Sequence, residues 1–220
     1  MGELGRVVEL MQSARQRYRT LYVEVRSYAR MDLFVEAMKR SVERQPYKSA
    51  LILTPNGDVD DEPPTEREGT GRLWVENPSR YRVELRSSGD PPWVEVGRRP
   101  WLETPRPETY PIPPDTLGLE EIYDPGLLIA ELWLEPAGGG TVAGREGIVV
   151  RASPRPTLRA GGMEFLHLDP VLADAYELVI DAERGIVLRL EARVGGELMD
   201  LTEVTHVAFD EPIPDELLQG

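Results

Sequence analysis

Residues 176–209 read YELVIDAERGIVLRLEARVGGELMDLTEVTHVAF, and this stretch decides the fold class. Apolar and polar residues alternate through three segments, which are separated by the short connections DAERG and VGGE. An alternation with a period of two residues predicts strands that bury one face, and connections this short join antiparallel neighbours. The C-terminal third of the chain therefore predicts an antiparallel β-sheet.

Strand patterns also lie upstream of this stretch, at 20–28 (TLYVEVRSY), 146–152 (EGIVVRA) and 164–169 (EFLHLD). Two segments show helical spacing of apolar residues instead, at 3–17 and 32–45. A further short helix is expected to begin with Asp124 as N-cap and Pro125 at its first position, and to run into a strand that ends near Glu135. Helices thus come first and strands dominate later, which indicates an α+β fold of one domain over residues 1–220.

The segment GRLWVENPSRYRVELR at 71–86 predicts a hairpin with a defined register. With Asn77 to Ser79 as a three-residue loop, one face becomes charged and the other apolar. A slip of one residue would mix the two faces, so the pattern favours this register. The expected pairs are Val75–Tyr81 and Leu73–Val83 on the buried face and Trp74–Arg82 on the exposed face.

The next segment, PPWVEVGRRPWLETP at 91–105, predicts a second hairpin that turns near Gly97 to Pro100. Five prolines follow within 104–118. An irregular segment of this length in a compact domain is typical of a lid or a linker.

Composition excludes several classes of protein. The 220 residues carry a net charge of −14 and no cysteine. Nucleic acid is an unfavourable partner for such a chain, and disulfides and iron–sulfur clusters are excluded. No apolar run reaches the length of a membrane span, and the N-terminus has no apolar secretory core. We expect a soluble, cytoplasmic protein, with export as the alternative if a signal peptide has been removed.

The glycine-rich stretch AGGGTVAGREGIVVRA at 137–152 resembles two phosphate-binding fingerprints. Both need a helix directly after the glycines, whereas 146–152 predicts a strand. The P-loop pattern also fails because Arg145 and Glu146 replace its lysine and hydroxyl residue. We therefore expect a flexible hairpin loop at these glycines and no nucleotide cofactor.

Residues 55–70 predict a polar loop in which Asn56, Asp58 and Asp60 have the first spacings of an EF-hand. Asp61 stands where that loop requires glycine, and Arg67 stands where it requires a bidentate glutamate. No metal is therefore expected. The two histidines, His167 and His206, lie at alternating positions of predicted strands, and no nucleophile–base motif accompanies them. The sequence predicts no catalytic residue.

The segments at 71–101, 142–156 and 176–218 together resemble the LolA/LolB-like superfamily of lipoprotein carriers, which includes RseB-type stress sensors. Among its members the chain looks most similar to uncharacterised actinobacterial proteins. The resemblance implies an unclosed, strongly curved antiparallel sheet, with the N-terminal and short internal helices packed on its concave side. It also implies that an acyl chain or another apolar group is held between the sheet and the helices.

We therefore expect a non-catalytic binding protein for an apolar or amphipathic, acyl-type ligand. Trp101 and Tyr110, beside and within the proline-bearing segment, and Trp133, after the short helix, are the candidate ligand-binding residues. Two alternatives remain open. The first is a regulatory protein-interaction module whose own helices fill the barrel, and the second is a small-molecule enzyme on the same fold.

Overall fold

The computed structural model describes residues 2–44, 65–77, 80–87, 92–98, 119–155 and 173–219. These residues form nine antiparallel strands in one sheet, in the order β4-β3-β2-β1-β9-β8-β7-β6-β5. The strands are β1 Thr20–Arg30, β2 Glu66–Glu76, β3 Arg80–Ser87, β4 Trp93–Arg98, β5 Leu132–Val142, β6 Arg145–Pro154, β7 Ala175–Asp181, β8 Val187–Val194 and β9 Glu197–Phe209.

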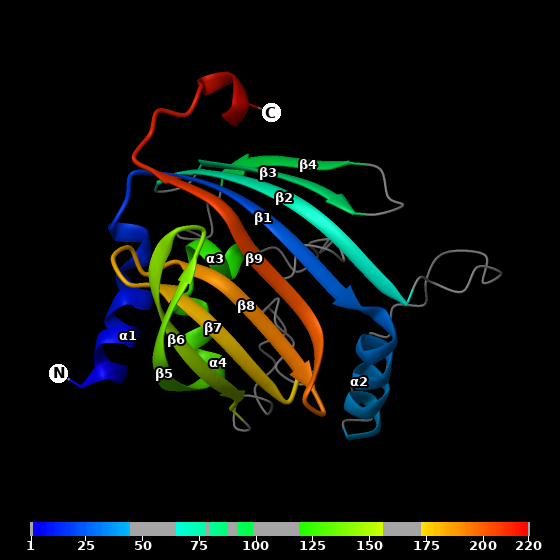
Figure 1. Ribbon diagram of the computed structural model, residues 1–220. Coiled ribbons are helices and arrows are strands. Elements are labelled where there is room, and N and C mark those ends of the chain that lie inside the picture. Colours follow the sequence, from blue (N-terminus) through cyan, green and yellow to red (C-terminus); the bar gives the residue numbers. More distant parts are fainter. Residues whose placement is uncertain are drawn as a thin grey trace.

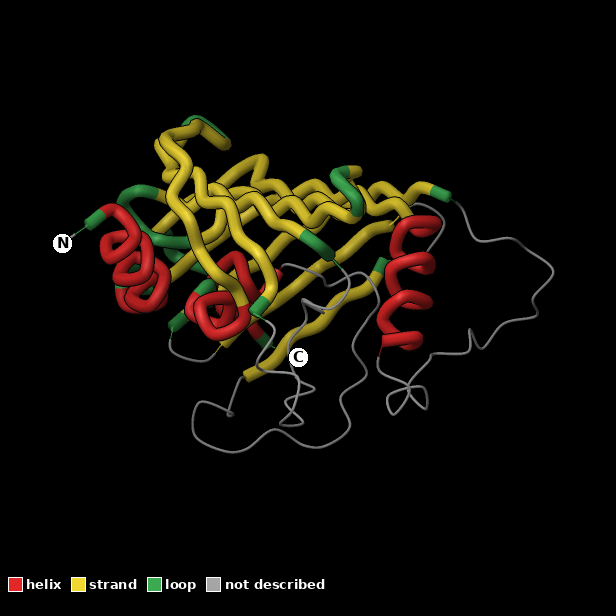
Figure 2. The backbone as a smooth tube through the Cα atoms, turned by 90° about the horizontal axis from the view of Figure 1, so that it is seen from below, coloured by secondary structure: helices red, strands yellow, loops and turns green. Residues whose placement is uncertain are grey.

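The helices are α1 Glu3–Ser13, α2 Met31–Arg44, α3 Leu119–Tyr123 and α4 Gly126–Glu131, with 3-10 turns η1 Ala14–Gln16 and η5 Asp215–Leu218. Seen from below, α1, α2 and α4 lie on the same side of the sheet (Figure 2). Helix α1 lies at one end of the sheet and α2 at the other (Figures 1 and 2).

The sheet is strongly curved and does not close, because β4 and β5 are its two edges (Figure 1). Register shifts interrupt the ladders at four places, including Glu24/Val25 on β1 and Val179/Ile180 on β7. Such bulges bend a strand and increase its twist, so they account for part of the curvature. The predicted α+β half-barrel is confirmed.

The register predicted for the hairpin at 71–86 is also confirmed. Leu73 pairs with Val83, and Val75 pairs with Tyr81, all four being buried. On the other face, the Arg82 guanidinium lies 6.0 Å from the centre of the Trp74 ring. The sorting of charged from apolar side chains therefore identified the correct pairing.

The predicted polar loop at 55–70 is wrong at its end, because β2 begins at Glu66. Glu66 to Thr70 pair with residues 26–30 of β1. Pairing with a neighbouring strand has thus made this polar segment part of the sheet. The second hairpin was predicted to turn near Gly97, but Gly97 lies within β4, opposite Tyr81. Residues 99–118, which would complete that hairpin, lie outside the described residues.

The glycines at 138–140 were predicted to form a hairpin loop, and this prediction is wrong. They belong to β5, and the turn lies at Ala143 and Gly144, whose φ angles are 49° and 74°. Gly138 has a φ of 123° beside the register shift at Pro136/Gly138, a backbone conformation that favours glycine. The turn is followed by β6, which confirms the strand predicted at 146–152 in place of the helix that a phosphate-binding motif would need.

The short helix α4 begins one residue later than predicted, with Pro125 rather than Asp124 at the N-cap. The Asp124 carboxylate instead accepts a hydrogen bond from the Arg15 guanidinium at 3.0 Å. A tertiary ion pair has thus replaced the local capping role expected from the sequence.

Candidate functional site

A line of cross-strand neighbours on the helix-covered face divides the sheet into two parts. Val150, Leu178 and Leu190 occupy this line on β6, β7 and β8, and all three are buried. The same line continues through smaller side chains on β9, β1, β2 and β3, which are Thr202, Ser27, Gly69 and Ser87. Side-chain bulk along this one line therefore falls between Leu190 on β8 and Thr202 on β9.

The part with large side chains is closed, and we call it the sealed half. Its sheet residues Val150, Leu178 and Leu190 pack in one cluster with Val7, Leu10 and Met11 of α1 and Leu128 of α4. Val7, Leu10 and Met11 follow helical spacing, so α1 presents one apolar stripe to the sheet. Burying each large side chain contributes roughly 1.5–3 kcal/mol.

The part with small side chains we call the open half. It consists of Ser27, Gly69, Gly71, Leu85, Ser87 and Trp93 on β1 to β4. Gly71 is buried and the other five are only partly buried. Leu85 and Trp93 border the second apolar cluster, which lies under α3. The open half is thus continuous with an apolar core yet is not sealed by α1, α3 or α4.

The two glycines of the open half are required by their neighbours. A Cβ atom on Gly69 would lie 2.6 Å from the Ser27 hydroxyl oxygen. A Cβ atom on Gly71 would lie 2.8 Å from a methyl carbon of Val25 and 3.0 Å from a methyl carbon of Leu85. Side chains from β1 and β3 thus reach across β2 and occupy the space over these two glycines.

Helix α2 contacts β1 and β2, which belong to the open half, and β9, which lies next to it. Its N-terminus is anchored by Arg30, which donates hydrogen bonds of 2.7 and 2.5 Å to both carboxylate oxygens of Asp32. These bonds lower the pKa of Asp32 to about 2. Leu33 and Ala37 point into the cluster of the sealed half. Helix α2 therefore contacts strands of the open half and also contributes two side chains to the core of the sealed half.

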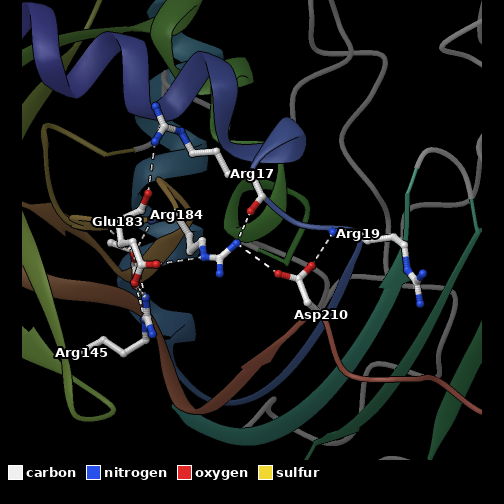
Figure 3. A network of polar contacts seen from close by, with 7 residues as sticks. Arg17, Arg19, Arg145, Glu183, Arg184 and Asp210 are labelled. Carbon is white, nitrogen blue, oxygen red and sulfur yellow. Dashed lines mark hydrogen bonds and ion pairs between the residues drawn. The ribbon is translucent and has the colours of Figure 1, made fainter.

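A polar network at the rim of the sheet joins the β7–β8 turn to the chain around β1 (Figure 3). The Arg184 guanidinium donates to the carbonyl oxygen of Arg17 and lies 3.2 Å from a carboxylate oxygen of Asp210. The other Asp210 oxygen accepts the backbone N–H of Arg19 at 2.7 Å, and this bond holds the Asp210 pKa below its usual value. The network therefore fixes the end of β9 to the start of β1.

The same network contains a buried carboxylate. Asp181 is fully buried, pairs with the Arg145 guanidinium and accepts the backbone N–H groups of Glu183 and Arg184. The centre of the Phe209 ring lies 4.9 Å from the Arg145 guanidinium and 5.2 Å from the Arg184 guanidinium. Because each charge has a partner, we assign this cluster a structural role.

Gly185 completes the rim. Its φ is 78°, and a Cβ atom there would lie 2.2 Å from the carbonyl oxygen of Leu10 on α1. The β7–β8 turn therefore rests directly on the backbone of α1, which closes the sealed half at this end.

The sequence-predicted site residues are not brought together among the described residues. Trp101 and Tyr110 lie outside the described residues, and their assignment stays a prediction. Trp133 lies on β5 between Leu132, which is buried, and Leu134, which packs on the core, so its side chain points away from the helices. It is 56% exposed, and the Arg155 guanidinium stacks 4.3 Å from its ring centre.

Sequence reasoning missed the residues of the open half. The strand pattern held the necessary signal, because the confirmed register places Gly71 beside Leu85 on the face of Leu73 and Val83. A run of small residues on an otherwise apolar face could have been noticed in the sequence. What could not be inferred was which helices cover which part of the sheet.

Other kinds of site have no support within the described part of the chain. It contains no group of three or more potential metal ligands. His206 is exposed, and its ring centre lies 5.8 Å from that of Tyr22. His167 lies outside the described residues. No helix of residues 2–44, 119–155 or 173–219 is long and apolar enough to cross a membrane.

The unclosed curved sheet with helices on its concave side matches the fold of known structures, as the sequence resemblance had indicated for the fold. Among solved structures, that of MucB is similar over 98% of this chain and 62% of its own, with 16% identity and a TM-score of 0.51. The chain therefore spans less than two thirds of MucB, and the likeness shows the fold alone. The particular similarity to actinobacterial members stays a prediction.

Two further structures have lower scores. The MucA/MucB complex of Pseudomonas aeruginosa is similar over 99% of this chain and 59% of its own, with 18% identity and a TM-score of 0.46. A LolA superfamily protein of Nitrosomonas europaea is similar over 98% of this chain and 97% of its own, with 8% identity and a TM-score of 0.31. No family model and no curated protein matches the sequence.

Proposed function

We propose that the chain is a non-catalytic binding protein that holds an apolar or amphipathic, acyl-type ligand on the open half, beside α2. The observation that supports this most is the loss of side-chain bulk across one face of a continuous sheet. Leu178 and Leu190 pack under α1, whereas the same line carries only the small residues Ser27 and Gly69 on β1 and β2. Ligand sites are typically concave, largely apolar and equipped with a few polar groups.

The two neighbouring lines of the open half suit an amphipathic molecule. One line is apolar and runs through Trp93, Leu85, Gly71 and Val25. The next line carries the hydroxyl groups of Ser87 and Ser27 and continues to Thr202. An alkyl chain on the first line and a polar head on the second would leave few groups unsatisfied.

Tryptophan emission with a fatty acid or a fluorescent apolar probe tests this proposal. We expect saturable binding in the micromolar range, about −8 kcal/mol. Burial of a few hundred Å² of alkyl surface, at roughly 25 cal/mol per Å², supplies free energy of that order before the costs of association. Trp93→Phe should remove the spectral shift, and Trp133→Phe should keep it. No saturable signal with acyl chains of several lengths would refute the proposal.

The protein-interaction module is the alternative, and the exposed ring of Trp133 on the edge strand β5 is the observation that favours it. An edge strand can pair with a partner chain, but Pro136 and the register shift beside it are features that discourage pairing. Loss of partner capture in Trp133→Ala, with unchanged acyl binding, would separate the two functions.

We further propose that residues 1–220 act as one domain, since β1 and β9, from opposite ends of the chain, pair at the centre of the sheet. The cytoplasmic and exported alternatives for its location are both compatible with the binding proposal.

A further inference from the structure

The outer face of the sheet, opposite the helices, carries a hollow of about 220 Å³ over β1, β2 and β3. It forms where the β1–β9 ladder shifts register, between Glu24 and Val25. The backbone of Val25 and Gly71 forms its floor, because their neighbours in sequence point outward. The lining residues are Glu24, Val25, Thr70, Gly71, Arg72, Glu84, Arg86 and Thr205.

The two carboxylates of this hollow already have partners. Glu84 accepts hydrogen bonds from Arg82, with nitrogen–oxygen distances of 2.8 and 2.6 Å. Glu24 accepts the hydroxyl of Tyr22 at 2.5 Å and lies 3.4 Å from Arg72. Burial and this hydrogen bond raise the pKa of Tyr22 to about 12, so the hydroxyl stays a donor at neutral pH. Neither carboxylate is left with an uncompensated charge.

The arginines are less fully engaged. Arg86 is exposed and forms no ion pair with any residue in the described part of the chain. The Arg72–Glu24 pair is wide and its arginine is 55% exposed, and exposed pairs of this kind contribute little free energy. Thr70 lies directly across from Arg86 on β2 and adds a hydroxyl group. Among the described residues, the hollow thus has one positive charge without an ion-pair partner, beside a second guanidinium that can change partner.

We propose that this hollow binds a small oxyanion of the phosphate or carboxylate class through Arg86, Arg72 and Thr70. Guanidinium groups bind such anions with paired hydrogen bonds, and a hydroxyl donor adds a third direction. The volume lies below the roughly 300 Å³ at which pockets begin to hold drug-sized ligands, so an acyl chain does not fit. The site is independent of the open half, because it lies on the opposite face of the same strands.

Titration of inorganic phosphate into the ¹⁵N-labelled protein tests the proposal, with chloride used to keep the ionic strength constant. We expect saturable shifts of the Thr70, Arg72 and Arg86 amide signals. Arg86→Gln should weaken binding at least tenfold, whereas Arg151→Gln, an exposed arginine elsewhere on the outer face, should leave it unchanged. Equal shifts with chloride alone, or unchanged binding in Arg86→Gln, would overturn the proposal.

A short-chain phosphatidic acid, used below its micelle concentration, distinguishes a lipid headgroup from a free anion. Shifts of the same three amide signals by both probes would support recognition of the phosphate in either source. Shifts by inorganic phosphate alone would support a free anion as the ligand. Shifts by the lipid alone, at residues away from the hollow, would count against the site.

Discussion

The sealed half and the open half share one sheet and one line of cross-strand neighbours, yet they differ in side-chain size and in burial along that line. Leu178 and Leu190 in the sealed half are covered by α1 and α4. Ser27 and Gly69 in the open half are small and only partly buried. Under the proposed function, one part of this continuous ladder serves stability and another part serves binding.

The largest effect should come from a cavity in the sealed half. Leu178→Ala should lower the free energy of unfolding by about 2–5 kcal/mol, because the side chain is fully buried. Leu85→Ala in the open half should cost only about 1 kcal/mol, since its side chain is partly buried. Urea unfolding of both variants decides the matter, and equal losses would contradict the distinction between the halves.

A smaller loss is expected where the β7–β8 turn meets α1. Gly185→Ala should lower the free energy of unfolding by about 2 kcal/mol, since it combines a positive φ with a contact at the Leu10 carbonyl. Gly195 also has a positive φ, of 60°, but faces open space, so Gly195→Ala should cost about 1 kcal/mol. Thermal unfolding compares the pair. Identical behaviour would show that the turn does not support α1.

Filling the open half should affect binding more than stability. Ser27→Leu would place an isobutyl group over Gly69 and should weaken acyl binding at least tenfold, about 1.4 kcal/mol. Arg26→Leu, one residue away on the outer face, is the matched control and should retain binding. Calorimetric titration of the same fatty acid into both variants measures the difference. Undiminished affinity in Ser27→Leu would show that the ligand does not bind over Ser27.

The smallest effect on stability is expected on the outer face of the sheet, where the Tyr22 hydroxyl titrates. Tyr22 has its pKa raised to about 12, so the stability that it contributes below pH 10 should be lost as the pH rises towards 12. Glu24→Gln removes one cause of the raised pKa, the hydrogen bond from Tyr22 to a carboxylate. It should therefore lower the midpoint of the Tyr22 titration. Ultraviolet difference absorbance against Tyr22→Phe reports that midpoint, and an unchanged value in Glu24→Gln would exclude the carboxylate as a cause.

Strand alternation predicted the fold well because it records burial directly. The pairing of Leu73 with Val83 followed from side-chain sorting alone. The glycines at 138–140 were misassigned because glycine has no side chain to record a face, and neighbouring strands decided their conformation. Asp124 was misassigned as a cap because its partner, Arg15, lies more than a hundred residues away in sequence.

The candidate site could not be predicted in the same way. Ser27, Gly69 and Gly71 were proposed as a site because α1 and α4 pack on another part of the sheet, and helix placement depends on tertiary packing. Aromatic residues suggested ligand contacts from the sequence, but Trp133 points away from the helices whereas Trp93, which was not selected, lies in the open half.

Paramagnetic broadening by a spin-labelled fatty acid tests the central claim most directly, because it maps the ligand onto the sheet. We expect the strongest broadening at the Ser27 and Gly69 amides and at the Trp93 indole, with weaker broadening at Leu190 and Leu178, which lie two and three strands from Ser27. Broadening centred on Trp133 or on the outer face, or no residue-specific broadening at all, would contradict it.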